Sequence, residues 1–164
     1  MTWVEPSQWY AQLASFYAAA AVFITDAEGR VLLVKPNYRD HWAIPGGYVD
    51  QAESPHEAAA RELREELRLA VSIGELLVID WASPAGPRPR ALVNFVFDGG
   101  QLASGSSIQV HPDELDTAAF YYPDQAQRLL PPRVAPRIET ALEARAKGTT
   151  AYLHDGMPHR ANSA

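Results

Sequence analysis

The part of the sequence that decides the fold runs from Gly47 to Leu69 and reads GYVDQAESPHEAAARELREELRL. It contains a strong helix start. The Ser54 side chain can accept a hydrogen bond from the backbone amide of Glu57, and the Glu57 side chain can reach back to the amide of Ser54. Pro55 suits the first helical position, because an N–H there would have no helical partner. The stretch therefore predicts a helix from residue 55 to about residue 68.

Three glutamates fall on one face of this helix. Each helical residue advances by about 100°, so Glu62, Glu65 and Glu66, spaced by three and four positions, bring their carboxylates together. Arg61 lies one turn before Glu65 and can pair with it. Clustered oxygen ligands suit Mg²⁺ or Mn²⁺, and such ions neutralise phosphate oxygens and activate water. An acidic helix edge alone is more often a solvated surface, so its neighbours decide the interpretation.

The residues before the helix favour a metal site. Gly46 and Gly47 lack side chains, which lets backbone atoms approach an ion or a phosphate closely. Glu53 adds a carboxylate just outside the helix start.

The whole stretch resembles the signature of the Nudix hydrolases, in which Gly, five residues, Glu, seven residues and Arg-Glu-apolar-x-Glu-Glu-x-Gly-apolar follow one another. The matching residues are Gly47, Glu53, Arg61, Glu62, Leu63, Glu65, Glu66 and Leu69. Such a match arises by chance about once in 10⁸ placements. Arg68 stands where the family usually has a glycine that ends the helix in a left-handed conformation. Because arginine adopts that conformation at a cost of about 1 kcal/mol or more, we expect the helix to end differently here.

The resemblance implies an α/β fold, a three-layer α/β/α sandwich around a mixed sheet. It also implies Mg²⁺-dependent hydrolysis, with Mn²⁺ as the alternative ion, of a diphosphate bond in a nucleoside diphosphate linked to another group. ADP-ribose or another nucleotide sugar is the candidate substrate, because some family members that cleave ADP-ribose have a proline where this chain has Pro84. The implied metal ligands are the Gly46 carbonyl and the carboxylates of Glu62, Glu65 and Glu66. Arg61 would hold a ligand carboxylate in place.

Six residues outside the signature are candidates for further roles. Similar proteins have a glutamate six residues before an aromatic residue, and Glu114 precedes Phe120 by that spacing, which makes it the candidate general base. Arg88 and Arg90 could meet substrate phosphate, and Arg39 could line a nucleoside pocket together with Tyr38 and His41. For each of these side chains, the alternative is a solvated loop residue.

The remaining pattern mixes strands and helices. We expect a single domain over residues 1–164, with an N-terminal arm at 1–14 that forms a short helix or packs on the domain. We expect a hairpin and then further strands and a helix, at 15–25, 31–34, 73–81, 91–97, 118–122 and 134–146. Residues 149–164 have little pattern, and we expect a tail there.

Composition excludes several functions. There are no cysteines, which rules out disulfides and thiolate chemistry and is consistent with a cytoplasmic protein. The net charge of −6 argues against nucleic acid as a stable partner. The apolar run from Leu13 to Ile24 is too short to span a membrane and has no basic leader. A homodimer is compatible with the sequence.

Two other classes of protein stay open. One is a catalytically silent Nudix domain that binds a nucleotide as a sensor or partner module, although the intact glutamates argue against it. The other is an ordinary α/β protein with an acidic helix, which the chance estimate makes remote.

Overall fold

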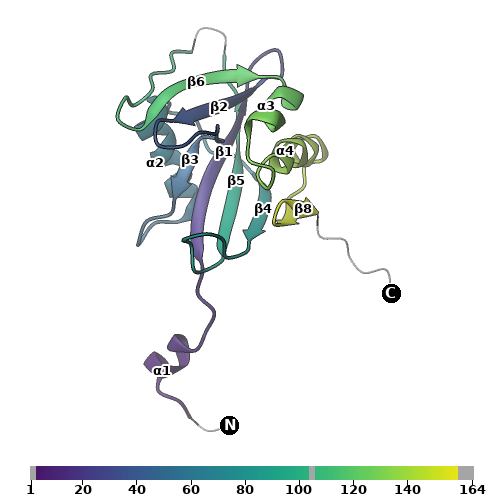
Figure 1. Ribbon diagram of the computed structural model, residues 1–164. Coiled ribbons are helices and arrows are strands. Elements are labelled where there is room, and N and C mark those ends of the chain that lie inside the picture. Colours follow the sequence, from purple (N-terminus) through teal and green to yellow (C-terminus); the bar gives the residue numbers. More distant parts are fainter. Residues whose placement is uncertain (1–2, 104–105, 159–164) are drawn as a thin grey trace, which may run out of the picture.

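A mixed β-sheet forms the middle layer of the molecule in the computed structural model, which describes residues 3–103 and 106–158 (Figure 1). Helix α2 (Pro55–Leu67) covers one face of the sheet. Helices α3 (Pro123–Leu129) and α4 (Pro136–Lys147) cover the other face. The α/β/α sandwich expected from the sequence is therefore confirmed.

The sheet of the described residues has eight strands, seven of them in the order β6-β2-β1-β5-β4-β7-β8, with β3 paired to β1. Strand β1 runs parallel to β5, and β4 runs parallel to β7, while the other pairs are antiparallel. The strands are β1 (Tyr17–Thr25), β2 (Val31–Pro36), β3 (Gly46–Tyr48), β4 (Leu76–Ala82), β5 (Leu92–Gln101), β6 (Leu115–Tyr121), β7 (Ala151–His154) and β8 (Met157–Pro158).

The central strand β1 supplies both hydrophobic cores. Successive side chains of a strand point to opposite faces, so Val22 and Ile24 pack under α2 while Phe23 packs under α3 and α4. Leu63 and Leu67 of α2 are buried against the first of these faces. This packing fixes which side of α2 is left for its acidic residues.

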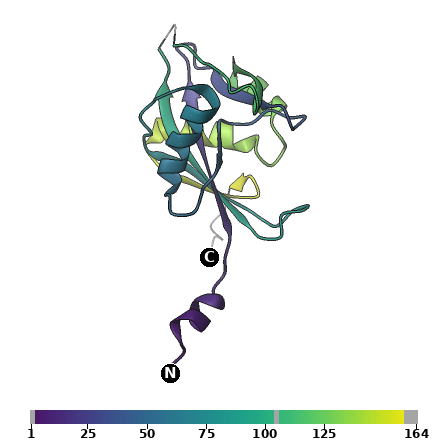
Figure 2. The same ribbon diagram turned by 90° about the vertical axis from the view of Figure 1, so that its left-hand side faces the viewer.

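Most predicted elements are present, β3 and α3 are additional to the predicted set, and further differences lie at the chain ends. Of the two alternatives for the N-terminal arm, the structure has the short helix and not an arm packed on the domain. Helix α1 (Pro6–Ala11) has no buried residues and lies away from the sheet (Figures 1 and 2). The expectation of a patternless tail is wrong for residues 151–158, because β7 pairs with β4 and β8 pairs with β7. Residues 159–164 of the expected tail lie outside the described part.

The end of α2 also differs from expectation. Arg68 has φ 55° and ψ 27°, the left-handed conformation that glycine favours. The amide of Leu69 donates to the carbonyl of Leu63 at 3.1 Å, and that of Arg68 donates to Arg64 at 3.2 Å. Leu69 is buried beside Leu63, so burial of the following leucine holds arginine in an unfavourable backbone conformation. None of the described helices has the length and apolar character needed to cross a bilayer.

Candidate active site

The start of α2 sets the rotation of its acidic face. Ser54 Oγ accepts from the amide of Glu57 at 3.3 Å, and the Glu57 carboxylate accepts from the amide of Ser54 at 2.7 Å. Both bonds of the predicted capping box are present. The helix therefore begins where the sequence places it, and the positions of the later glutamates follow.

Arg61 is the centre of a network of carboxylates. Its guanidinium donates to both carboxylate oxygens of Glu53, at 2.6 and 3.1 Å. It also donates to Glu62 at 2.8 Å, to Glu65 at 3.0 Å and to the backbone carbonyl of Tyr48 at 3.0 Å. These bonds lower the pKa of Glu53 and raise that of Arg61. The predicted pairing of Arg61 with Glu65 is present, and Arg61 joins α2 to the segment before it.

Glu66 lies deepest of the three glutamates. It is 7% exposed, and its Oε2 accepts from the amide of Gly46 at 2.9 Å. Burial raises its pKa to about 8, against the opposing effect of the Gly46 amide, and three nearby glutamates raise it further. Burial also raises the pKa of Glu62, although Arg61 opposes that shift. The site therefore concentrates negative charge where water is scarce.

Close approach requires a glycine at position 46 and leaves little room for a side chain at position 47. Gly46 has φ 140°, and a Cβ there would overlap the backbone of Ala20 and Ala21 in β1. A Cβ at Gly47 would overlap the carboxylate of Glu62. Both glycines therefore let β3 lie between β1 and the acidic face of α2.

The donor set suits a hard divalent cation, because it consists of carboxylates with a buried, uncompensated member. In the described ranges, no three acidic, histidine or cysteine side chains converge as ready metal ligands. The physical reason is that the Arg61 guanidinium draws Glu62 and Glu65 to itself, while Glu66 bonds to Gly46. Coordination by all three would require Glu62 and Glu65 to rotate toward Glu66. The ligand set of Gly46, Glu62, Glu65 and Glu66 therefore stays a prediction.

The structure brings the loop that carries Glu114 to this site. The amide of His111 donates to the backbone carbonyl of Glu66 at 2.8 Å, and the amide of Asn37 donates to the carbonyl of Glu114 at 3.0 Å. The negative charge of Glu114 contributes to the raised pKa values of Glu62 and Glu66. Glu114 itself is exposed, and its role as general base stays a prediction.

A cavity of about 410 Å³ adjoins the acidic site, since Gly46, Gly47 and Glu66 are among its lining residues. Its floor includes a row across three strands, in which Ala19 of β1 pairs with Asn94 of β5 and Asn94 pairs with Asp80 of β4. These residues lie on the face that α4 covers further along, where Val78 and Val96 belong to the core. In the part of this sheet face that borders the cavity, small and polar side chains thus take the place of the apolar core residues.

Two of the three predicted substrate-binding arginines line the cavity. Arg39 and Arg88 are among its lining residues, as are Tyr38 and His41. Arg90 does not line it, and its guanidinium lies over the ring of Tyr17, 5.9 Å from the centroid. Substrate contact by Arg39, Arg88 and Arg90 stays a prediction.

Sequence reasoning missed a second polar group in the cavity. Its members are Asp80, Asn94, Arg133, Arg137 and Asp155. One signal was available, because Asp80 interrupts the apolar strand LLVIDWA, and a charged residue on a buried strand needs a partner. Its partner Arg137 is 57 residues away along the chain, and only the tertiary structure joins them.

An acidic helix packed on a mixed sheet beside a polar cavity places the protein in the α/β class, with a candidate site for a hard divalent cation. The family model of the NUDIX domain matches residues 15–144 of the chain. The chain therefore belongs to the Nudix family.

Several known proteins are similar to the chain. An ADP-ribose pyrophosphatase of Mycobacterium tuberculosis is 31% identical over 126 residues, covering 73% of this chain and 59% of that protein. Diphosphoinositol polyphosphate phosphohydrolase 2 of Rattus norvegicus is 44% identical over 63 residues, covering 38% of this chain and 35% of that protein. The crystal structure of the MutT protein from Methanosarcina mazei Go1 has the same fold, with a TM-score of 0.68 at 19% identity, over 80% of this chain and 96% of that one. The chain therefore spans between 35% and 59% of the length of these two curated relatives.

Proposed function

We propose that the protein is a divalent-metal-dependent hydrolase that breaks a diphosphate bond in a nucleoside diphosphate derivative. The observation that carries the proposal is the position of the acidic face of α2. Glu66 lines the cavity itself, and Glu62 and Glu65 lie on the same face of α2, where Arg61 donates to both. A substrate in the cavity would therefore place its diphosphate beside these carboxylates.

The residues of the chain divide the work of this reaction. Glu62, Glu65, Glu66 and the Gly46 carbonyl would hold Mg²⁺ or Mn²⁺, which supplies charge neutralisation and a more acidic water when bound. Arg61 keeps Glu65 and Glu53 in place by charge-assisted hydrogen bonds. Glu114 would accept the proton of the water that attacks phosphorus, from a loop tied to the backbone of Glu66.

The candidate substrate is ADP-ribose or another nucleotide sugar. The names of the relatives support this choice, since two of them are ADP-ribose pyrophosphatases. The cavity supports it too, because Tyr38 and Trp42 provide aromatic surface for a base, and Trp42 is held edge-to-face by Tyr121 at 5.0 Å. The competing substrate is a diphosphoinositol polyphosphate, because the names of other relatives give that compound as their substrate.

The test is a hydrolysis screen of nucleoside diphosphate derivatives and a diphosphoinositol polyphosphate, with Mg²⁺ or Mn²⁺, following the release of phosphate-containing products. We expect turnover of nucleotide sugars that is lost in Glu65→Gln while the circular dichroism spectrum is kept. Arg64→Gln, an exposed change on another face of α2, is the matched control and should retain the rate. Nucleotide binding without turnover by the wild type would overturn the proposal in favour of a silent sensor domain.

A further inference from the structure

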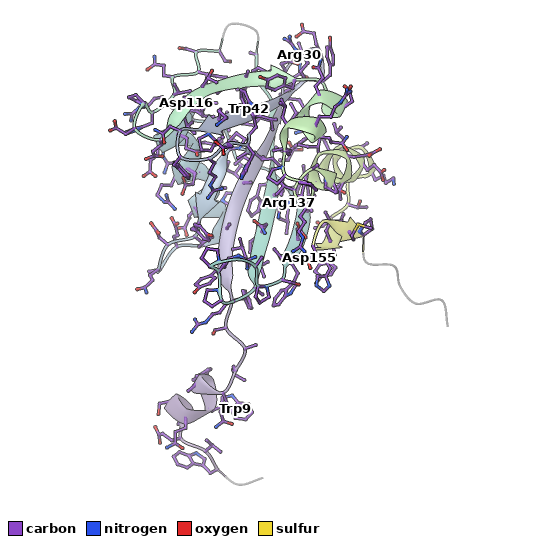
Figure 3. All side chains as sticks on the ribbon, viewed as in Figure 1. Trp9, Arg30, Trp42, Asp116, Arg137 and Asp155 are labelled. Atoms are coloured by element: carbon purple, nitrogen blue, oxygen red, sulfur yellow. The ribbon has the colours of Figure 1, made fainter. Side chains whose placement is uncertain are left out.

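Arg137 is a buried cation that the proposed reaction does not use. It lies near the start of α4, is 8% exposed and lines the cavity. Its Nε donates to Asp80 Oδ2 at 2.7 Å. Figure 3 shows Arg137 between α4 and the sheet, with Asp155 closer to the β7–β8 end. A buried guanidinium at the wall of a cavity is a candidate ligand-binding group.

Asp80 holds Arg137 in position. Asp80 is 1% exposed, and its second carboxylate oxygen, Oδ1, accepts from the amide of Gly156 at 3.2 Å. Both oxygens of Asp80 therefore have partners. Because the Nε bond fixes the plane of the guanidinium, the two terminal amino groups of Arg137 have a defined direction.

The terminal amino groups of Arg137 are left for a ligand. Within residues 3–103 and 106–158, Asp80 is the only hydrogen-bond partner found for the Arg137 side chain, through Nε. Among the described residues, His111 Nδ1 is the only fully buried side-chain nitrogen or oxygen without a hydrogen-bond partner. The terminal nitrogens of Arg137 are therefore not fully buried, and they are accessible from the cavity that Arg137 lines. Two parallel N–H donors on a planar group match the geometry of a phosphate or a carboxylate.

Two other arginines add positive charge at the same cavity. Arg133 lines it and lies 3.6 Å from Asp155, with 66% of its side chain exposed. Arg88 also lines it, and backbone carbonyls of Ala82 and Ser83 accept from its guanidinium at 3.3 and 2.7 Å. Carbonyls orient a guanidinium without neutralising it. With Arg39, four arginines line the cavity, against the three carboxylates of Glu66, Asp80 and Asp155, in a protein whose net charge is −6.

The turn between β7 and β8, which helps to hold these residues in place, lies outside the segment that the family model matches. Asp155 and Gly156 form the turn between β7 and β8, whereas the family match ends at residue 144. Asp155 also accepts from the amide of Ser83 at 2.8 Å, which joins this turn to the start of the Arg88 loop. The arginine group is therefore built partly by a segment that follows the residues matched by the family model.

We propose that Arg137, assisted by Arg133 and Arg88, binds a second anionic group of the substrate, a phosphate monoester or a carboxylate carried away from the scissile diphosphate. The inference rests on the proposed function for the position of that diphosphate at the acidic site. It makes the arginine group a determinant of specificity. The preferred substrate is then a nucleotide derivative with an additional negative charge.

Matched substrate pairs test the preference. NADH and NADPH differ by one phosphate on the nucleoside, and UDP-glucose and UDP-glucuronate differ by one carboxylate on the sugar. We expect kcat/KM to favour the anionic member of at least one pair by about tenfold or more, mainly through KM. Equal values within both pairs would overturn the inference while leaving the proposed function intact.

Variants assign the preference to the arginines. Arg133→Gln and Arg88→Gln should each reduce the ratio between anionic and neutral members, and the control Arg128→Gln, which pairs with Asp124 on the surface of α3, should not. Removal of the Arg137 charge would leave Asp80 buried without its cation, so Arg137→Lys is the variant of choice. We expect it to keep the fold and to lose most of the preference, because lysine lacks the bidentate geometry. An unchanged ratio in all three arginine variants would contradict the assignment.

Anion binding can also be followed without turnover. Inorganic phosphate is added to the metal-free wild type, and the Nε–Hε signal of Arg137, identified by its loss in Arg137→Lys, is recorded by NMR. A saturable shift of that signal at millimolar phosphate is expected, and no shift would overturn the subsite. If no nucleotide is hydrolysed and this shift still occurs, the proposed function fails and the subsite stands.

Discussion

At the scale of single residues, Glu62, Glu65 and Glu66 share the spacing of one helix face but have different environments. The Glu65 side chain is 53% exposed, that of Glu62 is 14% exposed, and Glu66 as a residue is 7% exposed. Glu66 is the carboxylate for which loss of water matters most, and its raised pKa follows from that burial.

The raised pKa of Glu66 predicts how the stability of the metal-free protein depends on pH. The folded state holds this proton more tightly than the unfolded chain, so the contribution of Glu66 is present in full below its ordinary value of 4.5 and is lost as pH rises through about 8. Glu66→Gln should therefore raise the free energy of unfolding above pH 8 by about 2 kcal/mol or more. Urea unfolding at pH 5 and pH 8.5, as the difference between variant and wild type, isolates this residue from other titrating groups.

Metal provides the control for this prediction. Mg²⁺ should raise the Tm of the wild type at pH 8.5 and should have little effect on Glu66→Gln, which offers a neutral ligand in place of the carboxylate. A variant that is less stable than the wild type at pH 8.5 without metal would contradict the argument.

Glu114 should affect rate without affecting stability. It is exposed, so Glu114→Gln should leave the Tm unchanged, and loss of a proton acceptor should lower kcat by about 100-fold or more. Asp116→Asn, an exposed change in β6 two residues further along, is the matched control in the same steady-state assay. Full activity of Glu114→Gln would place the general base elsewhere.

At the scale of an element, α2 shows a local preference overridden by packing. Its start obeys the sequence, because Ser54 and Glu57 need only each other. Its end does not, because Arg68 is left-handed where its own preference is right-handed. The adjacent Leu69 is buried in the core under α2, and that burial offsets the local cost.

Replacing Arg68 with glycine should therefore stabilise the protein. Glycine adopts a positive φ without steric cost, so Arg68→Gly should raise the free energy of unfolding by about 1 kcal/mol and the Tm by roughly 2–4 °C. Arg64→Gly, an exposed change inside the same helix, should instead lower stability by about 1 kcal/mol. Calorimetry on the two variants would contradict the interpretation if both lost stability equally.

At the scale of the whole molecule, residues far apart in the chain build the cavity. The β7–β8 turn contacts both the end of β4 and the segment before α4, through Gly156 with Asp80 and Asp155 with Arg133. Gly156 has φ 76°, and a Cβ there would overlap the carbonyl of Arg133. This turn therefore fixes the spacing between the C-terminal strands and the arginine group.

A pair of glycine variants tests this spacing. Gly148→Ala meets only the cost of a positive φ, about 1 kcal/mol, because nothing lies within 4 Å of its added Cβ. Gly156→Ala should cost more, roughly 2–3 kcal/mol, because the backbone of Arg133 must also move. Thermal unfolding measures both, and equal losses would mean that the approach to Arg133 is not tight.

The sequence by itself determined the signature helix, its capped start and the pairing of Arg61 with Glu65. It also determined the β1–β2 hairpin that precedes the signature. These features depend on residues within a few positions of one another, where spacing and helix geometry suffice. Only the tertiary structure decided the burial of Glu66, the left-handed Arg68, the pairing of Asp80 with Arg137, and the strands in what the sequence presented as a tail. Burial and pairing across the chain depend on which surfaces meet, and strand pairing can give order to a segment that has no pattern of its own.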